Sequence, residues 1–195
     1  MKFREIAVSE LPLQLLSSFW REWFEADPWA ERFRCPVHNP ATDFSSRGRF
    51  KEAGECPECG SKLVPYWSQD RIDEYLSQVF AKPRLVVLGG LDDDGNVVAW
   101  SWGYSADEIE AFDDLPRGGL YIDHIGFDPK HARQDVDGFL EAGERLAREL
   151  EFTFMVTRTH KAATYVKAAI SPHGYAFLRD CPDEDDREYW AIPPW

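Results

Sequence analysis

The chain has 195 residues and a formal net charge of −13, and 44% of its residues are apolar and 14% aromatic. This length and composition predict one globular domain with a buried core and exclude a disordered chain. The acidic balance argues against a nucleic-acid partner or an anionic membrane surface, because phosphate contacts need a basic face. It favours a cationic partner.

The sequence opens without the apolar segment of a secretory signal, and no run approaches the roughly 18 apolar residues of a membrane span. We therefore expect a cytoplasmic protein with no membrane partner. The four cysteines, three of them in metal-type spacing, fit a reducing compartment better than a disulfide framework.

Apolar alternation over residues 3–8 predicts an edge strand at the start of the chain. A helix is expected next, with Ser9 as its N-cap and an apolar, aromatic stripe over residues 13–24. Asp27-Pro28 ends it. The stripe is expected to face the core, and a partner-binding surface is the alternative.

Two short motifs then place metal ligands two residues apart, C-P-V-H at 35–38 and C-P-E-C-G at 56–60. In such knuckles proline shapes the turn and glycine lets the backbone curl around the thiolates. The four ligands fill the tetrahedral shell of a structural zinc, so a catalytic zinc is not expected. Cys181 is an alternative fourth ligand, and reduced thiols in an irregular loop are the alternative to a metal. The predicted zinc ligands are Cys35, His38, Cys56 and Cys59.

Residues 35–60 are interpreted as a zinc-binding insertion in a single domain spanning 1–195. The metal would fold a segment too poor in apolar residues to fold alone. Between the knuckles lie Arg47, Arg49 and Lys51. This basic group could hold an anionic partner or a nucleotide phosphate, and a solvated loop is the alternative.

The remaining elements alternate between strands and helices. Residues 68–80 predict a helix, and strands at 85–88 and 97–102 flank an Asp-Gly turn that predicts a hairpin. An acidic loop over 106–116 could attract a cationic amine. A strand at 120–127, a helix ending near 150, a strand at 152–157, a helix at 161–169 and a hairpin of 175–178 with 188–192 follow.

The segment 120–150 is central to the sequence. Leu120, Ile122, Ile125 and Phe127 are the apolar positions of its strand, and apolar residues from 139 to 150 recur near a 3.6 period. A strand that leads into a helix through a polar loop presents unpaired backbone N–H groups and a positive dipole end. This arrangement can hold a phosphate.

The run I-D-H-I-G-F-D-P-K-H at 122–131 resembles the fourth strand and following loop of the GNAT superfamily of acyl-CoA-dependent N-acetyltransferases, roughly I-E-x-L-x-V-x-P-x-Y. The preceding hairpin and Gly174-Tyr175, similar to the family's terminal G-F pair, extend the resemblance. It implies an α/β (α+β) fold with a central mixed sheet flanked by helices. It also implies transfer of an acetyl group from acetyl-CoA to a cationic amine of a small molecule or protein.

The resemblance implies that the strand pairs with the pantetheine arm and that the next loop, R/Q-x-x-G-x-G/A in the family, wraps the pyrophosphate. One register places its key positions on Arg133, Val136 and Gly138, and another on Ala132, Asp135 and Asp137. Neither restores both glycines, and the two aspartates would repel a diphosphate. The implied cofactor-binding residues are Ile125, Phe127, Arg133, Gln134, Val136, Asp137 and Gly138.

Asp123 stands where many GNAT enzymes place a glutamate, so the resemblance implies that it is the catalytic base; a solvent-facing position is the alternative. Alternation sends His124 to the opposite face unless a bulge re-aims it. The family's usual acid, a tyrosine, has no direct counterpart, although Tyr165 and His173 lie nearby in sequence. The alternative function is a GNAT-fold protein without acetyl-CoA activity, acting as a binding or regulatory module with a protein partner.

Overall fold

The computed structural model describes residues 1–40, 47–128, 130 and 135–194, and gives no side-chain description for residues 14, 15, 17 and 18. The chain divides into two compact units. We call Pro12–Ala81 the knuckle unit, and Met1–Leu11 with Lys82–Trp195 the sheet unit. The knuckle unit thus contains two helices in addition to the predicted insertion at 35–60.

The sheet unit is built on a seven-stranded sheet in the order β1-β4-β5-β6-β7-β9-β8. Neighbouring strands are antiparallel except β6 and β7, which are parallel. The strands are β1 (Lys2–Glu5), β4 (Val86–Leu91), β5 (Val97–Ser105), β6 (Leu120–Phe127), β7 (Met155–His160), β8 (Ala176–Asp180) and β9 (Arg187–Ile192).

Asp92 forms the turn between β4 and β5. Its carboxylate accepts the backbone N–H groups of Asp94 at 3.0 Å and Asn96 at 2.8 Å, and Gly95 adopts φ +85°. An aspartate that bonds its own following backbone and a glycine with positive φ are the usual chemistry of a tight hairpin turn. The hairpin predicted around this turn is confirmed.

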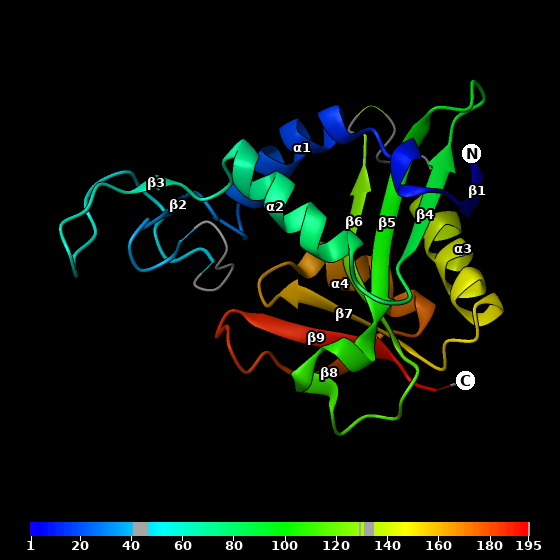
Figure 1. The fold of residues 1–195 in the computed structure, drawn as a ribbon. Helices are drawn as coiled ribbons and strands as arrows, with labels where there is room; N and C mark the ends of the chain where they lie inside the picture. Colours follow the sequence, from blue (N-terminus) through cyan, green and yellow to red (C-terminus); the bar gives the residue numbers. More distant parts are fainter. Residues whose placement is uncertain (41–46, 129, 131–134, 195) are drawn as a thin grey trace. The chain divides into compact units, whose positions relative to one another are not determined.

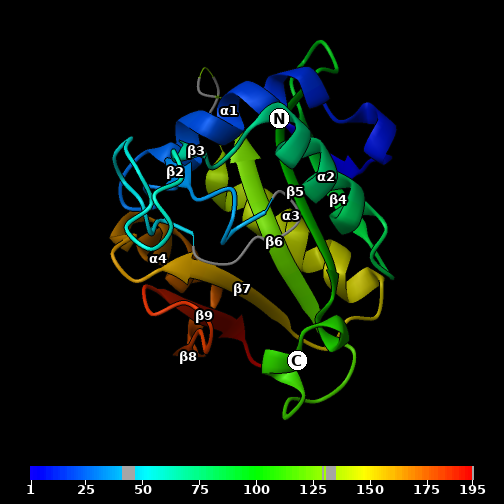
Figure 2. The same ribbon diagram turned by 60° about the vertical axis from the view of Figure 1, so that its left-hand side comes forward.

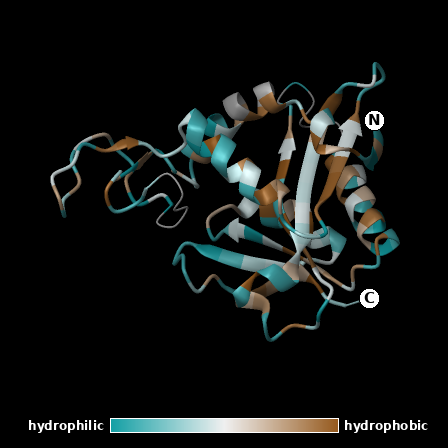
Figure 3. Cartoon of the chain, viewed as in Figure 1, coloured by the Kyte–Doolittle hydropathy of each residue, from teal (hydrophilic) through white to brown (hydrophobic). Residues whose placement is uncertain are grey.

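Two helices, α3 (Val136–Glu149) and α4 (Thr164–Ile170), contribute to one apolar cluster with the sheet. Ala147 of α3 and Ile170 of α4 are buried in that cluster together with Leu120 and Ile122 of β6. Because one cluster contains residues from both helices, α3 and α4 cover the same face of the sheet (Figure 2). In Figure 3, β4 is hydrophobic along much of its length, whereas β9 is mostly hydrophilic.

A β-bulge interrupts the pairing of β5 with β6. Trp102 lies opposite His124, but the next residue of β5, Gly103, lies opposite Ile122. No β5 residue therefore lies opposite Asp123 in the register. An extra residue in a strand reverses the facing of every residue beyond it. Ile125 consequently packs against the α3 side of the sheet, the same side as Ile122.

The knuckle unit contains α1 (Leu13–Glu25), α2 (Gln69–Phe80) and a two-stranded antiparallel sheet of β2 (Phe33–Arg34) and β3 (Val64–Pro65). An aromatic cluster holds α1 to α2. Trp20 contacts Trp67 and Tyr75 edge-on or tilted, with ring centroids 5.3 Å apart in each case. Leu16 and Trp20 are buried, which confirms that part of the predicted apolar stripe faces a core.

The expected α/β class, a mixed sheet flanked by helices, is confirmed. The prediction of Ser9 as the N-cap of α1 is wrong. Ser9 lies in a short 3-10 helix, η1 (Val8–Glu10), and Pro12 precedes α1. The Glu10 carboxylate accepts the backbone N–H of Ala7 at 2.8 Å. This bond favours the 3-10 turn over an α-helix that begins at Ser9. The strand predicted at 152–157 instead begins at Met155, because Phe152 and Phe154 are buried in the connection before it.

Among the described residues, no helix has both the length and the apolar character that crossing a membrane requires.

Gly103, at the bulge, has no room for a side chain. A Cβ there would lie 2.4 Å from the backbone oxygen of Tyr121, which cannot move without shifting β6. We expect Gly103→Ala to lower the free energy of unfolding by about 1–3 kcal/mol, as measured by urea denaturation. Gly143→Ala is the control, since its Cβ would meet only Leu88 at 3.6 Å and a helical alanine stabilises by about 0.5–1 kcal/mol. Equal effects of the two substitutions would contradict this account of the bulge.

Candidate functional site

Strands β6 and β7 part after three paired residues. Their parallel ladder runs from Leu120 opposite Met155 to Ile122 opposite Thr157. At that point the Thr157 hydroxyl donates to the Ile122 carbonyl at 3.1 Å. Beyond it the two strands diverge toward their carboxyl ends (Figure 1). Within the described residues, no strand pairs with the β7 side of β6 over 123–127, and we call this stretch the open edge.

Asp123, the predicted base, lies at the first position of the open edge. Its Oδ2 accepts the indole N–H of Trp102 at 3.0 Å, and the side chain is partly buried. No residue of β5 lies opposite Asp123 in the ladder register, and the carboxylate accepts its bond from the indole of that neighbouring strand. The structure therefore supplies a fixed carboxylate where β6 and β7 separate.

His124 stacks on the same indole. The rings of His124 and Trp102 are 4.4 Å apart at 24°, and both side chains are buried. Burial lowers the pKa of His124 to about 3, because desolvation disfavours the imidazolium. This neutral ring fixes the position of Trp102, and at neutral pH it has no proton to donate as an acid.

The side chains of Ile125 and Phe127 face away from any ligand at the open edge. Ile125 packs against the α3 cluster, and the Phe127 ring contacts Phe139 at 5.3 Å. Only their backbone groups are therefore available for the pairing that the family resemblance implies.

The first turn of α3 is capped by the chain itself. Asp135 is the N-cap residue, and its Oδ1 accepts the backbone N–H of Gly138 at 3.1 Å. A Cβ on Gly138 would lie 2.5 Å from that oxygen, so the carboxylate rests directly on the turn. An aspartate in this place stabilises a helix by about 1 kcal/mol and occupies the N–H that would otherwise face an anion.

The other predicted loop residues are distributed unevenly. Arg133 and Gln134 lie outside the described residues. Val136 and Gly138 are partly buried in the first turn of α3, and the exposed Asp137 pairs with His173 Nε2 at 3.2 Å. Of the implied loop residues, the described chain thus contains Val136, Asp137 and Gly138, none of which carries a positive charge.

Neither Tyr165 nor His173, the two residues near the expected position of the acid, is assigned that role. Tyr165 is 62% exposed on α4, and His173 is engaged with Asp137. Lys167, on the same helix, is held between the Lys161 carbonyl at 2.5 Å and Glu188 at 3.0 Å.

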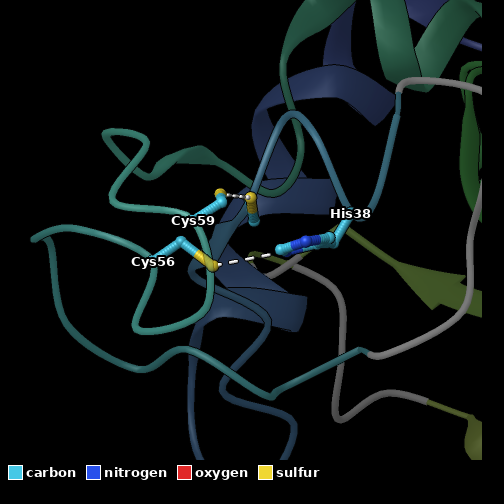
Figure 4. Close-up of side chains that lie close together, drawn as sticks. His38, Cys56 and Cys59 are labelled. Carbon is cyan, nitrogen blue, oxygen red and sulfur yellow. Dashed lines mark hydrogen bonds between the residues drawn. The ribbon is translucent and has the colours of Figure 1, made fainter.

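The second candidate site is the predicted metal centre. One ligand atom from each of Cys35, His38, Cys56 and Cys59 lies within 4.8 Å of the others. The sulfurs of Cys35 and Cys59 are 3.6 Å apart, and Cys56 Sγ is 3.4 Å from His38 Nδ1 (Figure 4). A tetrahedral zinc with Zn–S of about 2.3 Å and Zn–N of about 2.0 Å would give an S···S edge of about 3.8 Å and an S···N edge of about 3.5 Å. The donor set therefore has the size and chemistry of a zinc site.

The two knuckles have the same backbone design. The residue after the second ligand donates its N–H to the carbonyl of the first ligand, Asn39 to Cys35 at 2.9 Å and Gly60 to Cys56 at 2.8 Å. Gly60 adopts φ +72°, the left-handed conformation for which glycine is preferred.

Hydrogen bonding differs between two of the thiols. Bonds from the Ser61 hydroxyl and backbone N–H lower the pKa of Cys59 to about 7. Desolvation raises the pKa of the buried Cys56. Cys181, the alternative fourth ligand, belongs to the sheet unit, where its thiol donates to the Tyr189 hydroxyl at 3.5 Å. His38 is therefore the fourth member of the cluster.

Contacts within the knuckle unit connect the first knuckle to α2. Arg71 of α2 is fully buried and donates to the Pro40 carbonyl at 2.8 Å and to Asn39 Oδ1 at 3.0 Å. Arg34 donates to the Asn39 carbonyl at 2.6 Å. Asn39 thus joins the ligand loop to a helix more than thirty residues further along the chain.

Two of the three basic residues between the knuckles have internal contacts. The Arg49 guanidinium forms an ion pair with Glu58, and that of Arg47 lies 5.6 Å from the Trp67 ring and 5.7 Å from the Tyr75 ring.

Comparison with solved structures identifies the fold. The chain superposes on a GNAT superfamily phosphinothricin acetyltransferase from Sinorhizobium meliloti in complex with acetyl-CoA, with a TM-score of 0.58 and 13% identity over 99% of this chain and 88% of that one. It is similar to the ribosomal-protein-S18-alanine N-acetyltransferase of Escherichia coli, with a TM-score of 0.55 and 12% identity over 99% and 93%. A spermidine N-acetyltransferase variant from Vibrio cholerae gives a TM-score of 0.56 and 10% identity over 99% and 95%.

The chain therefore has the GNAT fold. At these identities the similarity shows the fold alone. No protein-family model matches the chain, and no curated protein matches it.

Sequence reasoning missed three contacts at these sites, Trp102 with Asp123, His173 with Asp137, and Arg71 with Asn39. Each joins elements far apart in sequence, and no local pattern marks them. A signal did exist for the cap, since an aspartate followed by a periodic apolar run is the usual start of a helix.

The depressed pKa of His124 makes stability depend on pH. Its pKa is about 3 in the folded chain against an ordinary 6.5, so between these values the unfolded chain binds more protons. The contribution of His124 to the free energy of unfolding is fully present above pH 6.5. Below that pH the contribution decreases by about 1.4 kcal/mol per pH unit. We expect His124→Phe to make the pH profile of urea unfolding shallower by this amount between pH 6 and about 4.5. Profiles with the same slope in both proteins would contradict the prediction.

Proposed function

We propose that the chain is an acyl-CoA-dependent N-acyltransferase that uses the opening between β6 and β7. The observation that carries the proposal is the parting of the strands after Ile122, with Asp123 at the first position of the open edge. An unpaired strand edge offers backbone N–H and C=O groups to an extended ligand. The amides of a pantetheine arm match those groups.

The residues at the opening suit the chemistry of acyl transfer to an amine. The amine nitrogen would attack the acyl carbon of a bound thioester, the C–S bond would break as the amide C–N bond forms, and the released thiolate would take a proton from solvent. Asp123 would take a proton from the amine, directly or through water, and its hydrogen bond from Trp102 would keep the carboxylate oriented. The stacked His124 would hold the indole in place. The open edge over 123–127 would fix the donor by backbone pairing.

A cationic amine is the acceptor class that we propose. The formal net charge of −13 attracts cations over the whole surface, and electrostatic attraction raises the rate of association. Among the structural neighbours, one is named for spermidine and another for an alanine of a ribosomal protein. These names support an amine of a small molecule or of a protein as the acceptor to be tested first.

A second candidate function is a binding or regulatory module without acetyl-CoA activity. The self-capped first turn of α3 favours it, because Asp135 occupies Gly138 N–H and adds negative charge where the family places a diphosphate.

Acetyl-CoA binding and turnover test the proposal. We expect acetyl-CoA at millimolar concentration to raise the melting temperature by a few degrees, because a ligand that binds only the folded chain stabilises it. Thiol release with a panel of polyamines and basic peptides reports turnover. Asp123→Asn should lower turnover by about 10²–10⁴-fold with the melting shift preserved. Asp93→Asn, at an exposed aspartate in the turn between β4 and β5, is the control and should leave turnover unchanged.

Unchanged turnover in Asp123→Asn would remove this residue as the base. Absence of both turnover and a melting shift would favour the binding module.

We also propose that Cys35, His38, Cys56 and Cys59 hold one structural zinc. The distances between the ligand atoms support this proposal. The small apolar core of the segment also supports it, because the buried residues of that cluster are Cys35, Cys56 and Leu63. A closed shell of four protein ligands leaves zinc no position for water or substrate. Its contribution would be to the folding of the ligand loops.

Replacement of one ligand tests the metal centre. We expect the purified chain to contain about one zinc and Cys56→Ser to lose most of it, as measured by elemental analysis. Tryptic cleavage after Arg49 and Lys51 should then become faster, because the loop loses its cross-link. Cys181→Ser, outside the cluster, should keep both the zinc and the protease resistance. A Cys56→Ser protein with unchanged zinc content would contradict the assignment.

A further inference from the structure

Asp135 occupies one backbone N–H group of the first turn of α3. The carboxylate accepts Gly138 N–H at 3.1 Å and lies where a Cβ of Gly138 would collide with it. The next acidic residue, Asp137, is exposed and directed to His173 at 3.2 Å. A helix N-terminus binds a phosphate through free N–H groups and its positive dipole end. Here an internal carboxylate already satisfies one of these groups and neutralises the dipole.

The open edge of β6 carries no such obstruction. Of the charged groups in the described part of this edge, Asp123 alone belongs to it, and that carboxylate is bonded to Trp102 on β5. The donor site that the fold offers is therefore suited to the amide arm of a pantetheine thioester and unsuited to the diphosphate that follows the arm in acetyl-CoA.

We propose that Asp135 is a specificity-determining residue that makes this protein a pantetheine-thioester binder with little selectivity for the nucleotide diphosphate. The proposal rests on the proposed acyltransferase function, and it assigns the source of donor affinity. Affinity comes from the open edge of β6, and Asp135 excludes the diphosphate from the first turn of α3.

Three substitutions separate charge from occupancy. Asp135→Asn keeps an N-cap acceptor of the same size and removes the charge. Asp135→Gly removes the charge and also frees Gly138 N–H. Glu141→Gln is the control, because it removes an exposed charge from the same helix beyond the capped turn.

The experiment compares the dissociation constants of acetyl-CoA and acetyl-pantetheine by calorimetry for the wild type and the three variants. We expect the wild type to bind the two donors within about threefold of one another. Asp135→Asn should tighten acetyl-CoA binding about tenfold, since removal of one like charge near a diphosphate is worth at least that factor. Asp135→Gly should tighten it further. Binding of acetyl-pantetheine should not change, and Glu141→Gln should resemble the wild type.

The outcomes distinguish this proposal from the proposed function. Wild-type binding of acetyl-CoA at least tenfold tighter than acetyl-pantetheine, with no gain in the Asp135 variants, would overturn the role of Asp135 and leave the acyltransferase intact. Acetyl-CoA binding in the variants but not in the wild type would support the role of Asp135 and end the acyl-CoA function of the natural chain. Failure of both donors to bind any of the proteins would overturn both.

Discussion

One extra residue in β6 determines the arrangement of the sheet unit. Because Asp123 is the inserted residue of the bulge, Ile125 faces the core under α3, and His124 lies on the opposite face against Trp102. The same residue lies where β7 leaves β6. Beyond the bulge β6 stays paired with β5 up to Phe127, whereas its ladder with β7 stops at Ile122. The bulge thus lies at the position along β6 where the opening that we propose as the donor site begins.

The sequence predicted the sheet unit well where local patterns decide structure. The strand over residues 120–127 has the bounds expected, since Leu120 and Ile122 alternate and Asp128-Pro129 ends the run. The spacing of Ile122 and Ile125 itself indicates a bulge. In a regular strand, residues three apart lie on opposite faces, so two apolar residues at this spacing share a face only if the strand contains an extra residue. The start of β7 was misplaced, since a buried apolar run does not distinguish a strand from a packed connection.

The candidate sites were predictable to different degrees. Ligand spacing brought Cys35, Cys56 and Cys59 into one prediction, whereas the choice of His38 over Cys181 depended on three-dimensional proximity. The position of Asp123 followed from the strand, but its bond to Trp102 joins separate strands and has no local signature. Tertiary contacts of this kind depend on the register of the sheet, and a single-residue shift changes them all.

The buried Arg71 connects the first knuckle of the metal centre to helix α2. Its guanidinium lies over the Tyr66 ring, 4.4 Å from the centroid, and donates to Asn39 and Pro40 in the first knuckle. A cation inside a protein must keep its acceptors, since an uncompensated buried charge is strongly destabilising. Unravelling of the knuckle would therefore remove two acceptors from a buried cation on α2. Order in the ligand loop and order in that helix should be lost together, as one cooperative unit of folding.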